Sequence, residues 1–78
     1  MTGAHYHINI FYSAEDDAFV ADVPDLEYCS ALGATPEEAL AEVLVAQRLW
    51  LESARERGQP VPHARYRPLI YQVSNAGR

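Results

Sequence analysis

The sequence predicts an α+β domain with the element order β-β-β-α-β, in which one long helix packs on one face of a small antiparallel-rich sheet. Three observations support this class. Segments before residue 33 alternate with period two, one long amphipathic stretch carries helix start and stop signals, and a last alternating segment follows a proline-rich connection. The length allows one domain, which we expect to span residues 1–78 with frayed ends at 1–4 and 75–78.

Three strands are expected before the helix, at residues 5–12, 18–23 and 27–32. The first presents alternate residues on one face: Tyr6, Ile8, Ile10 and Tyr12. Pro24 ends the second strand, because proline cannot donate a hydrogen bond to a sheet ladder. Gly33 ends the third. The acidic stretch between the first two strands predicts a hairpin connection longer than two residues.

The helix has the clearest local signals. Thr35 is placed to be the N-cap, Pro36 occupies the first helical position, and Glu38 completes a capping box. The helical pattern runs to about Arg57, and Gly58 is a good residue for the left-handed position that follows a helix. These signals predict a helix of twenty-odd residues.

The helix is amphipathic. Its expected core stripe contains Leu40, Val43, Leu44, Leu51 and Ala54. Gln47 falls inside the stripe and needs a hydrogen-bond partner if it is buried. The opposite side is largely acidic, but Val45 and Leu49 lie there one turn apart. These two residues are candidate contacts for another copy of the chain.

Residues 59–68 form a proline-punctuated, extended connection, and residues 69–74 alternate as a fourth strand at a sheet edge. Within the connection, the sequence Arg65-Tyr66-Arg67 combines basic and aromatic groups. Such a pair can stack on nucleic-acid bases, but two charges bind weakly. We therefore favour an interchain contact with the acidic helix of a second copy.

Charge is distributed unevenly along the chain. The formal net charge is −5, and all six basic residues are arginine. Residues 1–56 hold all eleven acidic residues and two arginines, a net charge of −9, whereas residues 57–78 hold four arginines and no acid. An acidic body is a poor general binder of phosphate backbones and a good match for a basic protein. No apolar run approaches a membrane span, and a cytoplasmic protein is expected.

Residues 23–39, VPDLEYCSALGATPEEA, resemble the "VPDLPGCxAxGDTxEEA" signature of HicB-like antitoxins. The stretch 58–62 is similar to the family's Gly-x-x-Ile/Val-Pro ending. Two departures occur inside the signature: Glu27 and Tyr28 replace the usual Pro-Gly, and Ala34 replaces the usual Asp.

This resemblance implies a partial RNase H-like domain that is not an enzyme. HicB-like proteins of type II toxin-antitoxin systems bind HicA, a small basic ribonuclease, and cover its active surface. They commonly form homo-oligomers, so a dimer or tetramer is expected. Many members carry a C-terminal DNA-binding module, but only 16 residues follow Pro62, too few for a helix-turn-helix. That length argues against direct DNA binding.

Candidate site residues fall into three sets. The acidic partner-binding set contains Glu15, Asp16, Asp17, Glu38, Glu42, Glu52 and Glu56. The oligomer-contact set contains Val45, Leu49, Arg65, Tyr66 and Arg67. The structural set, whose members are turn and cap residues, contains Pro24, Asp25, Gly33, Thr35, Pro36 and Glu38.

Other functions remain as alternatives. A stand-alone homo-oligomeric scaffold without a toxin fits the small size, because one helix leaves a sheet face uncovered. A metal-dependent RNase H-like nuclease needs converging carboxylates, for which Asp16, Asp17, Asp22 and Asp25 are the candidates. His5 and His7 share a strand face but supply no third ligand, and Cys29 is expected to pack as a small apolar residue. We therefore expect no cofactor, metal or catalytic residue.

Overall fold

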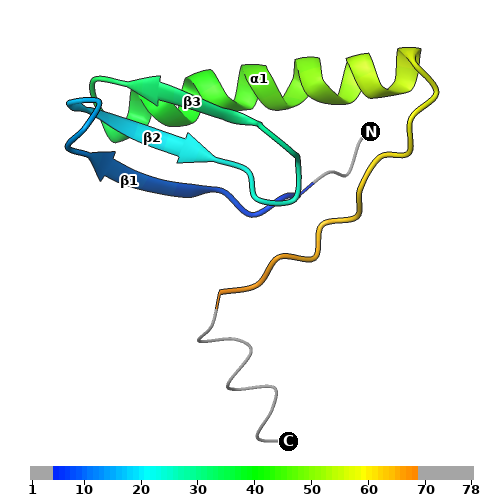
Figure 1. Cartoon of the computed structure of the whole chain (residues 1–78), viewed down its shortest axis with the longest axis horizontal. Helices are drawn as coiled ribbons and strands as arrows, with labels where there is room; N and C mark the ends of the chain where they lie inside the picture. The colour runs from blue at the N-terminus through cyan, green and yellow to red at the C-terminus, as the bar shows by residue number, and fades with distance from the viewer. Residues whose placement is uncertain (1–4, 69–78) are drawn as a thin grey trace, which may run out of the picture.

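The computed structural model describes residues 5–68, which form three strands and one helix (Figure 1). The elements are β1 (Asn9–Ser13), β2 (Ala18–Asp22), β3 (Ser30–Gly33) and α1 (Pro36–Glu56). The strands form an antiparallel sheet in the order β1-β2-β3, and α1 lies along one face (Figure 1). The α+β class and the order β-β-β-α are confirmed. The predicted fourth strand at 69–74 lies outside the described residues, as do the chain ends.

β1 is shorter than the alternating pattern that predicted it. Its first residue, Asn9, pairs with Asp22, the last residue of β2. The chain turns at Pro24, so β2 supplies no residues to pair with 5–8. Tyr6 and Ile8 nevertheless pack against the core. The alternation therefore predicted the strand but extended it too far, and Ile10 and Tyr12 on the same predicted face are exposed.

β3 begins at Ser30, so the expected strand start at Glu27 is wrong. Glu27 and Tyr28 belong instead to a turn, residues 24–29, in which the Val23 amide donates to the Cys29 carbonyl over 2.9 Å. Tyr28 has a φ of 61°, a left-handed conformation that no β-strand contains. This turn is called the Tyr28 turn below.

The two faces of the sheet differ in burial. Ala21 is fully buried, and its β3 partner Ala31 packs against the same core, so this face meets α1. Side chains alternate along a strand, so Phe11, Val20 and Leu32, which are paired across the sheet, point to the other side. Phe11 and Leu32 are each about half exposed. Among the described residues, this second face has no covering element, as predicted.

The start of α1 confirms the predicted cap. The Glu38 amide donates to Thr35 Oγ1 over 3.1 Å, while Glu38 Oε1 accepts from the Ala34 amide over 2.9 Å. The reciprocal bond thus reaches one residue before the N-cap. At the other end, Gly58 adopts a φ of 69° directly after the cap residue Arg57, as the sequence predicted.

Burial along α1 only partly follows the predicted stripe. Ala39, Val43, Leu51 and Ala54 are buried, whereas Leu40 and Leu44 are 36% and 46% exposed, so their assignment to the core is wrong. At about 100° per residue, Leu40 and Leu44 are each rotated by about 100° from their buried neighbours Ala39 and Val43, which places the two leucines at the edge of the buried stripe. Gln47 is half-buried, and its Oε1 has no hydrogen-bond partner among the described residues. Within residues 5–68, no helix is long and apolar enough to cross a membrane.

Candidate functional site

The Tyr28 turn presents the most exposed large hydrophobic side chain in the described part of the chain. Tyr28 is 95% exposed. Left-handed backbone costs a residue with a Cβ atom about 1 kcal/mol or more, and glycine is the residue that avoids this cost. An aromatic residue at this position therefore neither suits the backbone nor contributes to the core. Nothing in the packing of the fold explains its presence.

Hydrogen bonds hold the Tyr28 turn in a fixed shape. The Leu26 amide donates to the Val23 carbonyl over 3.1 Å, and the Cys29 amide donates to the Leu26 carbonyl over 3.2 Å. Trp50 of α1 donates from Nε1 to the Glu27 carbonyl over 2.9 Å. The side chains of Leu26 and Cys29 are buried on either side of Tyr28. The backbone that carries Tyr28 is thus fixed by hydrogen bonds and by its buried neighbours.

Asp25, in the same turn, anchors the connection that follows α1. Its Oδ2 accepts hydrogen bonds from the backbone amides of Arg65 and Tyr66, each at 3.1 Å. The sequence predicted a local turn role for Asp25 but not this contact, which spans forty residues and has no sequence signal. The carboxylate fixes residues 62–68 against the body of the domain.

The N-terminal segment holds the same connection from its other side. Tyr6 donates from its hydroxyl to the Pro62 carbonyl over 2.5 Å. The rings of His7 and Tyr66 lie 4.7 Å apart between centroids and are tilted by 53°. Burial and the negative charge of Asp25 raise the pKa of Tyr6. The phenol therefore stays protonated and remains a donor at neutral pH.

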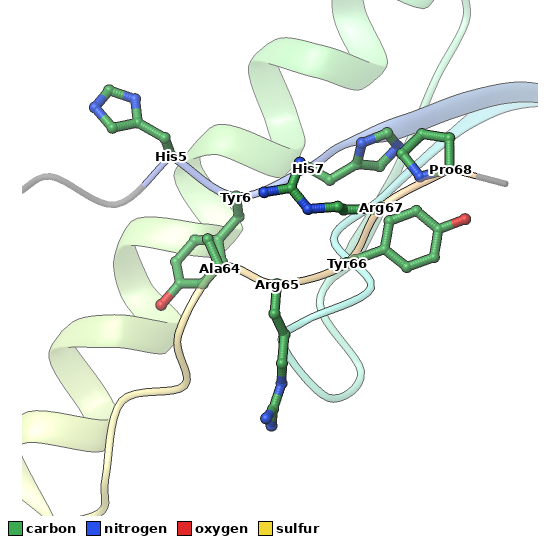
Figure 2. A pocket seen from close by; sticks show the side chains of 8 residues that line it. All are labelled: His5, Tyr6, His7, Ala64, Arg65, Tyr66, Arg67 and Pro68. Atoms are coloured by element: carbon green, nitrogen blue, oxygen red, sulfur yellow. The ribbon is translucent and has the colours of Figure 1, made fainter. Parts of the chain in front are cut away.

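An open cavity of about 300 Å³ lies between these two segments (Figure 2). It is lined by His5, Tyr6, His7, Ala64, Arg65, Tyr66, Arg67 and Pro68. The structure therefore joins the predicted Arg65-Tyr66-Arg67 group to two histidines and a second tyrosine. Figure 2 shows the Arg67 side chain extending across the space between Tyr6 and Tyr66, while Arg65 points away on the other side.

The predicted acidic residues do not form one patch. Glu15, Asp16 and Asp17 occupy the β1–β2 turn, at the end of the molecule where α1 begins and Glu38 lies (Figure 1). Glu56 is the last residue of α1, about 27 Å from Glu38 at 1.5 Å per residue. Glu42 and Glu52 lie between them on the exposed surface of the helix. The three turn acids and Glu38 thus lie at the hairpin end of the molecule, and the remaining acidic residues are spread along α1.

Some of these carboxylates have local partners. Tyr12 donates to Asp17 Oδ1 over 2.7 Å, and Ser13 donates to Asp16 Oδ2 over 2.8 Å. The hydrogen bond to Asp17 raises the pKa of Tyr12, with a smaller contribution from burial. Asp17 has a φ of 49°, which aspartate tolerates better than most residues. The turn acids therefore also stabilise the hairpin.

Val45 and Leu49, the predicted oligomer contacts on α1, are 42% and 56% exposed. They lie on the side of the helix away from the sheet. Their exposure makes them available to another molecule, and their role stays a prediction.

The residues considered for catalysis and metal binding are dispersed. The four candidate aspartates divide among the β1–β2 turn, the end of β2 and the Tyr28 turn. Within residues 5–68, no three His, Cys, Asp or Glu side chains lie close enough to hold a metal ion. Cys29 is buried in the core, as predicted, and burial together with the charge of Asp22 raises its pKa. A raised pKa keeps the thiol protonated and unreactive.

Comparison with known proteins assigns the family. UPF0150 protein ssl0259 of Synechocystis sp. is 40% identical to the chain over 53 residues, which make up 68% of this chain and 73% of that protein. No family model matches the chain, and no solved structure matches it significantly. Identity of this extent over most of both chains shows common membership. The chain belongs to the UPF0150 family, which is the HicB-like family whose signature residues 23–39 resemble.

Proposed function

We propose that the protein is an antitoxin-type binding module that binds a basic ribonuclease toxin of the HicA type and covers its active surface. Three features support the proposal: membership of the UPF0150 family, the net charge of −9 over residues 1–56, and the exposed Tyr28 on a rigid turn. The first points to the kind of partner and the second to its charge. The third carries the proposal, because neither the packing of the fold nor the backbone geometry accounts for an exposed tyrosine at this position.

Tyr28 has the properties of a residue kept for a partner. Strained backbone persists at functional positions, where the surrounding structure holds it in place. Tyrosine is among the residue types that dominate binding energy in protein interfaces, since it buries a large rigid ring and can also form a hydrogen bond. The fixed support removes the cost of ordering the loop on binding. Glu27, exposed beside Tyr28, suits a pocket rimmed by arginine or lysine.

The acidic residues would act mainly on the rate of association. Charges spread along α1 and at the hairpin turn attract a basic protein from a distance, and added salt weakens that attraction. Tyr28 would then supply short-range contact energy, which controls dissociation. The two sets of residues therefore make separable predictions: salt should change the association rate, and Tyr28 substitution should change the dissociation rate.

Co-expression with the product of a small basic reading frame, sought next to this gene, tests the proposal. We expect relief of toxicity and a purified complex, with Tyr28→Ala raising the dissociation rate at least about tenfold. Tyr12→Ala is the matched control, because Tyr12 is an exposed tyrosine with ordinary backbone geometry, 52% exposed. No complex with the wild-type chain would refute the proposed function. A complex that Tyr28→Ala leaves unchanged would refute the role of Tyr28 alone.

A homo-oligomeric scaffold module is the second candidate function. The row of Phe11, Val20 and Leu32 on the second face of the sheet favours it, because apolar side chains there have no covering element among the described residues. Sedimentation equilibrium of wild-type chain and of Leu32→Lys tests this candidate. A wild-type dimer that the substitution converts to monomer supports it, and a monomeric wild type at 100 μM or so rules it out.

A further inference from the structure

The cavity beside the N-terminal segment is basic, although the chain as a whole is acidic. Four of its eight lining residues are arginine or histidine, and none is acidic. The Asp25 carboxylate does not line the cavity, and it accepts the backbone amides of Arg65 and Tyr66. Those two donors offset part of the Asp25 charge. The Arg67 guanidinium therefore places a positive charge in the cavity, where an incoming ligand would meet it.

The same cavity is rich in aromatic side chains. Tyr6, His7 and Tyr66 all line it, and Figure 2 shows Tyr66 and His7 on one side of the space that Arg67 crosses. Arginine next to aromatic rings is the combination that binds a base by stacking and a phosphate by charge-assisted hydrogen bonds. A volume of about 300 Å³ lies at the lower end of the range for small-molecule sites.

The cavity is also pre-organised. Both of its walls are fixed to the domain, one by the Tyr6–Pro62 hydrogen bond and the other by the two bonds to Asp25. A ligand therefore does not have to order the two segments when it binds. We propose that this cavity binds a phosphorylated nucleoside, with its base against Tyr66 and its phosphate toward Arg67. The ligand could be a free mononucleotide or the end of a single-stranded RNA, since both present a base and a phosphate.

This inference does not depend on the proposed toxin, because it concerns a different surface and a small ligand. Arg65-Tyr66-Arg67 alone carries only two charges, which bind nucleic acid weakly. The fold brings His5 and His7 to the same cavity from a segment about sixty residues earlier. Arg67 supplies the charge for a single phosphate in this cavity, and the histidine and tyrosine rings add surfaces on which a base can stack.

Nuclear magnetic resonance titration of the full ¹⁵N-labelled chain tests the proposal. The probes are adenosine monophosphate, inorganic phosphate, adenosine and a single-stranded hexa-adenylate. We expect adenosine monophosphate to shift the amide signals of residues 5–7 and 64–67, and to bind at least about tenfold more tightly than phosphate or adenosine alone. Tighter binding of the hexamer would identify an RNA end as the ligand, and equal binding would identify the free nucleotide.

Two matched substitutions separate specific binding from general charge. Arg67→Gln and Arg65→Gln remove the same charge two residues apart, but only the Arg67 side chain crosses the cavity (Figure 2). We expect Arg67→Gln to weaken nucleotide binding at least about tenfold and Arg65→Gln less than about threefold. Unchanged amide signals away from residues 64–68 would show that both variants fold. Equal losses in the two variants, phosphate binding as tight as nucleotide binding, or no shifts at millimolar nucleotide would each overturn the proposal.

Discussion

The two connections that flank β3 use opposite kinds of residue. The connection from β3 to α1 is bounded by residues that its geometry requires: Gly33 ends β3, Thr35 caps α1 and Pro36 begins it. The Tyr28 turn, which precedes β3, contains an exposed tyrosine where the backbone favours glycine. Both connections are held by hydrogen bonds, so looseness does not explain the difference. The residues of the first connection stabilise the fold. The second connection carries a cost in stability, which we propose serves contact with a partner.

Substitution of Gly33 should give the largest loss. A Cβ atom added there would lie 2.8 Å from the Glu38 carbonyl carbon and closer still to the Ala39 nitrogen. These are backbone atoms of α1 and cannot rotate away. We expect Gly33→Ala to lower the free energy of unfolding by about 3 kcal/mol, measured by urea denaturation. Gly58→Ala is the control, since a Cβ there meets open space and only its positive φ matters. Equal losses of stability in Gly33→Ala and Gly58→Ala would show that the close approach of α1 is not what requires glycine at position 33.

Removal of the Asp25 carboxylate should open the attached connection without unfolding the domain. Asp25→Ala leaves the amides of Arg65 and Tyr66 without their acceptor. We expect hydrogen exchange at these amides to accelerate about tenfold or more, which corresponds to about 1.4 kcal/mol of local stability. Asp16→Ala, at an exposed turn acid, should leave their exchange unchanged. Full protection in Asp25→Ala would contradict the anchoring role.

Loss of the N-cap should cost less. Thr35→Ala removes the acceptor of the Glu38 amide, and we expect the free energy of unfolding to fall by about 1 kcal/mol. Thr35→Ser retains a hydroxyl and should restore most of the difference. Thermal denaturation of the three proteins, followed by circular dichroism, provides the measurement. A serine variant as unstable as the alanine variant would show that the hydroxyl is not the source of the effect.

The smallest effect concerns pH. Folding raises the pKa of Tyr6 above its ordinary value near 10, because burial and Asp25 disfavour the phenolate. A raised pKa gives stability that is fully present below the unfolded pKa and is lost as pH rises through the folded pKa. Wild type should therefore lose more stability than Tyr6→Phe above about pH 10. Parallel stability curves for the two proteins over that range would exclude this linkage.

Features set by neighbouring residues could be predicted from the sequence. The cap at Thr35 and the end of α1 at Gly58 depend on side chains within one helical turn, and both are confirmed. The alternation over residues 5–12 also predicted a first strand, and β1 confirms it from Asn9 onward. In contrast, the margin of the helix–sheet contact depends on how α1 is positioned over the strands. That position is not encoded locally, which is why Leu40 was assigned wrongly to the core.

Features of the site required contacts between distant segments. The Asp25 anchor joins residues forty positions apart, and the cavity joins His7 to Tyr66. No periodicity or spacing in the sequence predicts such contacts between distant residues. Tyr28 is an intermediate case, because its departure from a glycine position was visible in the sequence. Its left-handed backbone and near-complete exposure were not visible there.

The most direct test of the central claim is a paired measurement on Tyr28→Gly, with unfolding and binding to the co-expressed basic toxin determined in the same preparation. Glycine relieves the backbone at φ 61° and removes the exposed ring. We predict that unfolding becomes less favourable by about 1 kcal/mol while toxin affinity falls at least about tenfold. A variant that is no more stable than wild type, or that binds the toxin equally well, would contradict the account.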